Sequence, residues 1–269
     1  MSGTNVIDLV DVTLDHPRGP AESGPAASDQ RPLVAGASLG VASGEVVLVV
    51  GAAGVGTSRL VAAMLGEVPV SGGRIEILGR DVGKLRRSSL RLIRRRIGIV
   101  PQELCLLDDR SAQLNVVLPL EIDGIPREAS LHRACQILSQ LGLEAEATQP
   151  IDALSGAARQ RVAVARAMVR DPELVVADHP TSMQDAAGAE LVCTAIAIAA
   201  ARGAGCIVLG RDPALLALAD RHRWRKLGLI EGRLESLTEV SIDGRTLDEA
   251  FLESVPNVVQ FPLAAGAGG

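Results

Sequence analysis

An apolar run, a glycine-rich turn and the start of a helix follow one another in the segment VVLVVGAAGVGTSRL, residues 46–60. This layout is typical of a phosphate-binding loop with the pattern G-x-x-x-x-G-K-[S/T], in which backbone N–H groups at a helix N-terminus attract an anion. Gly51 and Gly56 fill the glycine positions and Ser58 fills the last one, but Thr57 stands where the lysine is required. The segment predicts a phosphate site without its usual cation, or alternatively a glycine turn that binds nothing.

The bulk composition limits the classes of protein that this chain can be. Its 269 residues are 47% hydrophobic, which is enough for a large core. A net charge of −5 gives no electrostatic reason to expect a nucleic-acid partner. No run reaches the roughly 18 apolar residues of a membrane helix, and MSGTNVIDLV at the start lacks the features of a signal peptide. We therefore expect a soluble, cytoplasmic protein, with four reduced and buried cysteines: Cys105, Cys135, Cys193 and Cys206.

Strand and helix patterns alternate along the chain. Apolar or alternating strands are expected at 6–14, 45–50, 73–82, 97–102, 173–180, 205–210 and, within RHRWRK, at 221–226. Helices are expected at 57–66, 127–141, 155–170 and 186–201. This alternation predicts a mostly parallel sheet with helices on both faces. The Pro-, Gly- and Ala-rich segment 17–32 is expected to be a flexible loop, and the tail after about residue 253 to be loose.

Two later segments support a nucleotide site. VVADHP ends a buried strand at Asp178, where a carboxylate anchors Mg²⁺ in P-loop proteins. LSGAARQRVAVARAM begins with Ser155 as an expected helix cap. With IGIVPQ, these segments have the order and spacing of an ABC-type ATPase, which the chain resembles from about residue 5 to 235. Within that superfamily, residues 90–124 look most like the cell-division ATP-binding protein FtsE, with exporter and lipoprotein-release subunits as close relatives.

The resemblance implies an α/β P-loop NTPase fold, with a RecA-like core, an antiparallel β portion and a helical lobe. The core would comprise residues 1–102 and 167–235, the helical lobe 103–166, and a C-terminal extension 236–269. It also implies ATP and Mg²⁺ as ligands, held between the phosphate loop of one chain and the LSGGQ-type signature of another in a head-to-tail dimer. An FtsX-like permease would be the membrane partner, with this chain peripheral on the inner face of the cell membrane.

The resemblance also assigns site residues. Mg²⁺ is expected at Ser58, Gln102 and Asp178, and Gln102 also matches the glutamine that senses the metal and the partner. Pro180 and Thr181 match the residues after the strand. Contacts with the nucleotide are expected from His16, Gly51, Gly54, Gly56, Thr57, Ser58, Arg59, Ser155, Gly156 and Asp185.

Five positions depart from the family pattern. They are Thr57 for lysine, His179 for the catalytic glutamate, Arg211 for the histidine that reads the γ-phosphate, Ala157 for the second signature glycine, and His16 for an aromatic ring. A lost lysine–phosphate contact removes about 1.5–3 kcal/mol of binding free energy. Arg59 cannot simply take the lysine's place, because two residues along a helix it points to nearly the opposite side.

The apolar strands and helix caps remain consistent with a folded protein. We therefore expect a degenerate ABC nucleotide-binding subunit with poor hydrolysis at its own site, favouring a heterodimer over a homodimer. A slow but active ATPase that uses His179 and Arg211 is one alternative. A module that binds a permease and no nucleotide is another. The basic helical face at Arg87, Arg91, Arg94 and Arg95 is expected to be solvated, or else to contact anionic lipid or the permease.

Overall fold

The computed structural model describes residues 5–16, 32–52, 54–237, 241–242 and 245–246. The chain divides into two compact units, 1–235 and 236–269. In the second unit, β11 (Ser241–Ile242) pairs with β12 (Arg245–Thr246) in an antiparallel ladder. Most of the expected flexible loop at 17–32 and the whole of the expected loose tail lie outside the described residues.

A six-stranded sheet forms the centre of the first unit, in the order β10-β9-β3-β8-β7-β6. The strands from β9 to β6 pair in parallel, as the alternation of strands and helices predicted. β3, β7 and β8 are buried along their whole length, which explains why they read as continuous apolar runs. The strands are β3 (Val46–Gly51), β6 (Ile97–Val100), β7 (Leu174–Asp178), β8 (Gly205–Leu209), β9 (Arg225–Ile230) and β10 (Arg233–Ser236).

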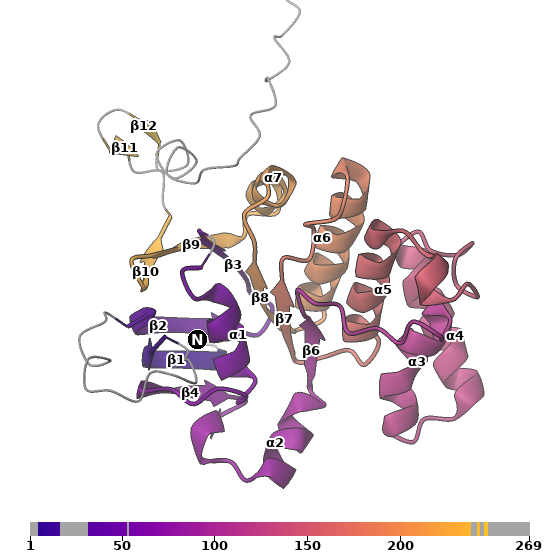
Figure 1. Cartoon of the computed structure of the whole chain (residues 1–269), viewed down its shortest axis with the longest axis horizontal. Helices are drawn as coiled ribbons and strands as arrows, with labels where there is room; N and C mark the ends of the chain where they lie inside the picture. Colours follow the sequence, from indigo (N-terminus) through magenta and orange to yellow (C-terminus); the bar gives the residue numbers. More distant parts are fainter. Residues whose placement is uncertain (1–4, 17–31, 53, 238–240, 243–244, 247–269) are drawn as a thin grey trace, which may run out of the picture. The chain divides into compact units, whose positions relative to one another are not determined.

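A four-stranded antiparallel sheet, in the order β2-β1-β4-β5, lies beside the parallel sheet, with α1 (Thr57–Met64) between the two (Figure 1). Buried Val, Ile and Leu side chains from both sheets and α1 form one hydrophobic core. Because α1 packs against both sheets, the loop that precedes it is held between them. The strands are β1 (Asn5–Leu14), β2 (Val34–Ala42), β4 (Gly72–Ile77) and β5 (Arg80–Asp81).

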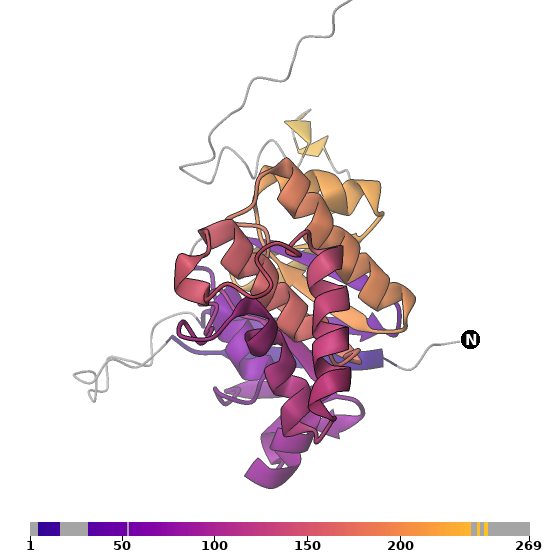
Figure 2. The same cartoon turned by 90° about the vertical axis from the view of Figure 1, so that its right-hand side faces the viewer.

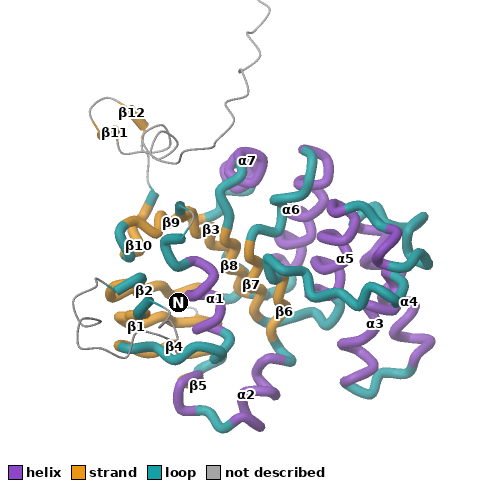
Figure 3. The backbone as a smooth tube through the Cα atoms, viewed as in Figure 1, coloured by secondary structure: helices purple, strands orange, loops and turns teal. Residues whose placement is uncertain are grey.

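Three helices pack against one another on the other side of the parallel sheet: α3 (Ala112–Ile122), α4 (Arg127–Gln140) and α5 (Gly156–Met168) (Figure 2). α5 also packs on β6, and α6 (Ala186–Ala201) lies beside α5 (Figure 3). The remaining helices are α2 (Arg87–Arg94), α7 (Pro213–Arg221) and the short 3-10 turns η2 (Val82–Lys84) and η3 (Ile151–Ala153). The α/β fold with an antiparallel portion and a helical portion is confirmed.

The proposed subdivision of the core and the lobe stays a prediction. The expected boundary between residues 166 and 167 falls inside α5, so a single rigid helix would belong to both parts. No helix in the described ranges is both long and apolar enough to cross a membrane.

The strand expected at 221–226 is wrong. α7 continues to Arg221, a turn follows with Arg223 at φ 56°, and β9 begins only at Arg225. Trp224 is 8% exposed and stacks on the His222 ring, with centroids 5.6 Å apart. The alternating charged residues predicted a strand too early in the chain. They lie just before β9, whose buried part is Leu227 to Leu229.

The cysteines also differ from expectation in their burial. All four are free thiols, but only two of them, Cys193 and Cys206, are buried. Cys105 and Cys135 are exposed, because they lie in the loop after β6 and on the outer side of α4.

Candidate functional site

The carboxyl ends of the parallel strands bring most of the expected site residues to one edge of the sheet. Leu209 of β8 pairs with Val49 on one side and with Asp178 on the other. Asp178 therefore lies level with Val49, two residues before Gly51, at a separation of about 10 Å across two strand spacings. Because β8 lies between them, Asp178 is not on the strand next to the loop.

The loop before α1 has the backbone of a phosphate cradle. Gly54 and Gly56 have φ angles of 83° and 105°, which side chains rarely adopt. An added Cβ at Gly56 would lie 2.8 Å from the Leu33 side chain, so the loop can pack only with glycine there. No side chain caps α1, and the N–H groups of Ser58 and Arg59 find no acceptor in the described ranges. These donors are free to bind an anion.

The side chains of the first turn of α1 differ in what they offer. Thr57 is 8% exposed, and its methyl group would lie 2.9 Å from a Cβ added to Gly51. It is packed inside the loop and carries no charge. Ser58 is exposed. Arg59 is partly buried, and its Nε is enclosed without a hydrogen-bond partner. Free N–H groups, open space beside Gly54 and a guanidinium without a partner among the described residues together fit the phosphate chain of a nucleotide.

Asp178 and His179 form a close pair at the end of β7. The Asp178 side chain is only 5% exposed, and its Oδ1 lies 2.8 Å from Nδ1 of His179. His179 has φ 52°, and its N–H donates to the Leu209 carbonyl at 2.7 Å, which fixes the backbone beside β8. With the proton on Nδ1, the imidazole donates to the carboxylate, which leaves Nε2 able to accept a proton.

Arg211 follows β8 at the same edge of the sheet. Its guanidinium makes no hydrogen bond or ion pair with the described part of the chain. Next to it, Asp212 accepts a hydrogen bond from the Thr181 hydroxyl at 2.7 Å and caps α7 through the Leu215 N–H at 2.9 Å. The sequence reading did not single out Asp212 as the residue that holds these two segments together.

Gln102 and His16 lie at the margins of this edge. Gln102 is exposed two residues after β6, which ends alongside β7. His16 is exposed two residues after β1. Leu14 of β1 pairs with Val34, and Val34 would lie 3.2 Å from a Cβ added to Gly56. The end of β1 therefore adjoins the phosphate cradle.

Ser155, Gly156 and Asp185 belong to a second group, at the N-termini of α5 and α6. Ser155 Oγ accepts from the Ala158 N–H at 3.1 Å, and Asp185 Oδ1 accepts from the Gly188 N–H at 2.7 Å, so both are helix caps as well as expected contacts. No hydrogen bond or ion pair among the described residues joins this group to the loop at 51–58.

A residue that sequence reasoning missed, Gln160, connects the two helices to the segment after β7. It is 2% exposed and uses its amide fully. Its Nε2 donates to the His179 carbonyl at 2.9 Å and to Ser182 Oγ at 3.1 Å. Its Oε1 accepts from Met183 N–H at 3.1 Å and from Gln184 Nε2 at 3.0 Å. The sequence did contain one indication of this role: Gln160 is a polar residue among the apolar positions on the buried face of α5.

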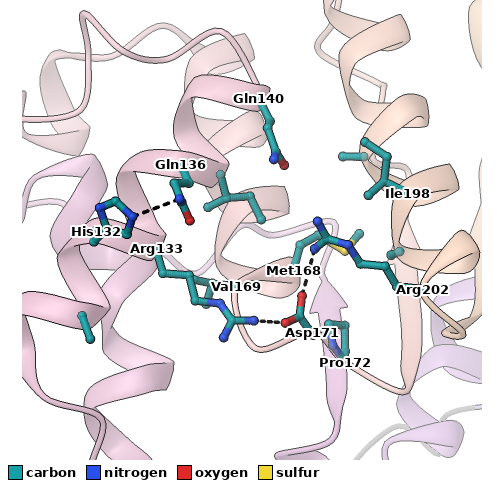
Figure 4. A pocket seen from close by; sticks show the side chains of 14 residues that line it. His132, Arg133, Gln136, Gln140, Met168, Val169, Asp171, Pro172, Ile198 and Arg202 are labelled. Carbon is teal, nitrogen blue, oxygen red and sulfur yellow. Dashed lines mark hydrogen bonds and ion pairs between the residues drawn. The ribbon is translucent and has the colours of Figure 1, made fainter.

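A separate cavity of about 550 Å³ lies between α4 and α6, at the turn before β7 (Figure 4). Arg133 and Arg202 reach from these two helices to the same Asp171 carboxylate, the latter at 3.1 Å. None of the expected site residues lines this cavity. Because Asp171 and Pro172 precede β7, the cavity lies at the amino end of that strand, whereas the phosphate loop lies at the carboxyl ends.

Comparisons with known proteins agree with this geometry. Residues 34–182, more than half of the chain, match the family model described as "ABC transporter". The methionine import ATP-binding protein MetN of Brucella abortus is 36% identical over 192 residues, covering 68% of this chain and 52% of that protein. The lipoprotein-releasing system ATP-binding protein LolD of Chromohalobacter salexigens is 38% identical over 198 residues, covering 73% of this chain and 82% of that protein.

A solved structure has the same fold. The dimeric ATP-binding cassette MJ0796, bound to ADP and Pi in a post-hydrolysis state, superposes with a TM-score of 0.75 at 26% identity. The match covers 87% of this chain and all of that one. The chain spans only about half the length of the MetN relatives that it matches. These relatives belong to methionine import and lipoprotein release, and not to the cell-division type that the sequence reading favoured.

Proposed function

The chain belongs to the ATP-binding subunits of ABC transporters, and from this premise we propose that it binds Mg²⁺-ATP weakly and hydrolyses it poorly at its own site. One observation carries the proposal: an uncapped glycine loop at the same sheet edge as Asp178, with a packed, neutral Thr57 at the lysine position. The backbone donors for phosphate are in place, whereas the lysine that would meet the β- and γ-phosphates is missing. A lost charge-assisted contact of about 1.5–3 kcal/mol weakens binding without abolishing it.

Three residues would hold the metal: Ser58 through its hydroxyl, Asp178 through its carboxylate and Gln102 through its amide oxygen. Oxygen ligands of this kind suit Mg²⁺, which neutralises phosphate charge when bound. His179 already occupies one oxygen of Asp178, so the other oxygen is the one available to the metal. Because His179 takes up one of the two carboxylate oxygens, Asp178 offers the metal a single ligand atom, which supports weak metal binding.

Poor hydrolysis follows from the replacement of the glutamate by His179 and of the histidine by Arg211. The imidazole is tied to Asp178 and differs in shape and reach from a carboxylate. The same contact favours a second candidate, a slow ATPase. With Nδ1 donating to Asp178, Nε2 of His179 is free to take a proton from water, and the unpaired Arg211 keeps a positive charge at this edge.

The test is titration of the purified full-length chain with ATP, with and without Mg²⁺, followed by a phosphate-release assay. We expect weak binding that Mg²⁺ strengthens and almost no turnover. Absence of ATP binding under both conditions would overturn the proposal in favour of an interaction module. Brisk turnover that His179→Ala abolishes would establish the slow-ATPase candidate instead.

We propose further that the chain works best in a heterodimer with a catalytically complete sister subunit. Its loop side lacks the lysine, the glutamate and the histidine, whereas its signature side keeps Ser155 and Gly156 and differs at Ala157 and Ala158, where LSGGQ has glycine and glutamine. In a mixed dimer, this chain would complete the partner's site with its signature. Ser155→Arg should then abolish most of the turnover of the co-purified dimer, and Asp178→Asn should matter much less. The reverse order would show that this chain's own site carries the activity.

A membrane permease is the proposed partner, which would place the chain at the inner face of the cell membrane. A cavity of about 290 Å³ at the open edge of β6 supports this, because it is lined by Arg94, Arg166 and Arg170 together with Ile97 and Ile99. Among the described residues, Arg166 donates hydrogen bonds to the carbonyls of Leu104 and Cys105 and forms no ion pair, and burial lowers its pKa from the usual value. Because Arg94 and Arg170 already pair with Glu67 and Asp123, at 3.8 and 2.7 Å, the groove suits a mainly apolar segment with an acidic residue opposite Arg166.

The type of transport system is the finest part of the proposal. Similarity to LolD over most of that protein's length favours an export or lipoprotein-release system, with an FtsX-like permease and a role in cell division as the alternative. Charge reversal at Arg91, exposed on α2 one turn before Arg94, should weaken co-purification with the permease. The matched reversal Arg233→Glu, on β10, should leave it unchanged. Arg91 does not line the groove itself, so equal retention by both variants would contradict docking across α2 beside it.

A further inference from the structure

Arg59, in the first turn of α1, has a guanidinium without a partner among the described residues. A guanidinium carries five N–H donors. Neither a hydrogen bond nor an ion pair from Arg59 is found within the described ranges, and its Nε is enclosed where water cannot easily reach it. An enclosed donor without a partner lowers the stability of a fold. Nη1 and Nη2 also have no partner among the described residues but are not enclosed, so the open end of the guanidinium is where an anion from outside the chain can bind.

The surroundings of Arg59 specify the charge of that partner. It is the third residue of α1, in a first turn that contains no acidic residue and no side-chain cap. The N-terminus of a helix carries partial positive charge, so a cation there is unfavourable. Free N–H groups and an unpaired guanidinium at one helix end both require an anion.

The position of Arg59 on the helix limits which part of a nucleotide it can reach. It lies about 200° around the helix axis from Thr57, so it cannot occupy the space of the missing lysine. Side chains on a helix tilt toward its N-terminus, and arginine is long enough to reach that end from its own side. A P-loop lysine meets the β- and γ-phosphates, while the loop N–H groups hold the α- and β-phosphates.

We infer that Arg59 is the cation that this site uses for nucleotide phosphates in place of the lysine, and that it contacts the α- and β-phosphates rather than the γ-phosphate. The inference rests on the nucleotide binding proposed above. The site would then differ from one with a P-loop lysine: the planar, forked guanidinium of Arg59 would lie on one side of the phosphate chain and the neutral Thr57 on the other.

The experiment compares ATP and ADP affinities of the full-length protein and two variants. Arg59→Met removes the charge but keeps an unbranched stem that packs similarly. It should weaken ATP and ADP binding alike, by roughly tenfold to a hundredfold. Arg59→Lys keeps the charge without the fork and should fall in between. Arg87→Met, at an exposed arginine of α2, changes the net charge equally and should leave both affinities unchanged.

Thermal unfolding of the nucleotide-free protein gives an independent readout. Arg59→Met should unfold at the same temperature as the parent or higher, because it removes an unpaired cation. A lower unfolding temperature, unchanged nucleotide affinity, or a loss confined to ATP would each overturn the inference. If the parent protein binds neither nucleotide, the proposed function fails as well. If the parent binds and Arg59→Met binds equally well, only the role of Arg59 is refuted.

Discussion

Replacement of Gln160 by leucine should loosen the attachment of α5 to the segment after β7. The four hydrogen bonds of the buried amide would be lost together. Three of the four groups that bond to the Gln160 amide keep another hydrogen-bond partner after its loss. The His179 carbonyl keeps Ser182 Oγ as a donor at 3.0 Å, and Gln184 Nε2 keeps the Ala157 carbonyl at 2.9 Å.

Met183 N–H loses its acceptor but belongs to an exposed residue, so water can replace the amide. At about 0.5–1.5 kcal/mol net for each bond, and with leucine burial offsetting part, Gln160→Leu should lower the free energy of unfolding by about 2 kcal/mol. Urea unfolding measures this, with the single, buried Trp224 as the fluorescent probe.

The matched control is Gln136→Leu. Gln136 is exposed on α4, and its one side-chain hydrogen bond within the described part of the chain is to the His132 ring, at 3.0 Å. Its replacement should change stability by no more than about 0.5 kcal/mol. If the two variants prove equally stable, the amide network does not hold α5 in place and the reasoning is refuted.

Three further outcomes are expected. Thr57→Lys should tighten ATP binding by roughly tenfold or more in calorimetry, because no charge now stands at position 57 to meet the β- and γ-phosphates, and adding His179→Glu should raise turnover; no change in affinity would contradict this. Gly98→Ala should destabilise by about 1–3 kcal/mol in urea unfolding, because its Cβ would lie 2.4 Å from the Ala167 carbonyl oxygen. A thiolate-specific reagent at about pH 8 should spare the two cysteines whose pKa burial raises to about 12, Cys193 and Cys206, and label the exposed pair, Cys105 and Cys135.

Local features of the fold were predictable from the sequence. Continuous apolar runs indicated β3, β7 and β8 because strands buried on both faces need no polar side. Ser155 indicated the start of α5 because a capping hydroxyl satisfies N–H groups within its own first turn. The phosphate loop was recognisable for the same reason: its glycines, its helix and its missing lysine all lie within one short segment.

Features that depend on contacts between distant segments were decided only by the tertiary structure. Periodicity shows that a strand is buried but not which strand pairs with it, so the position of β8 between β3 and β7, and hence the level of Asp178 against Val49, could not be read from the sequence. RHRWRK alternates like a strand, yet α7 and the packing of Trp224 end it in a turn. In sequence, Gln160 is an ordinary polar residue, and Arg59 is expected to contact the nucleotide only through the family resemblance. The tertiary structure gives Gln160 four hydrogen-bond partners and gives Arg59 none among the described residues. The sequence cannot show this, because the hydrogen bonds of a buried group depend on which distant segments the fold places beside it.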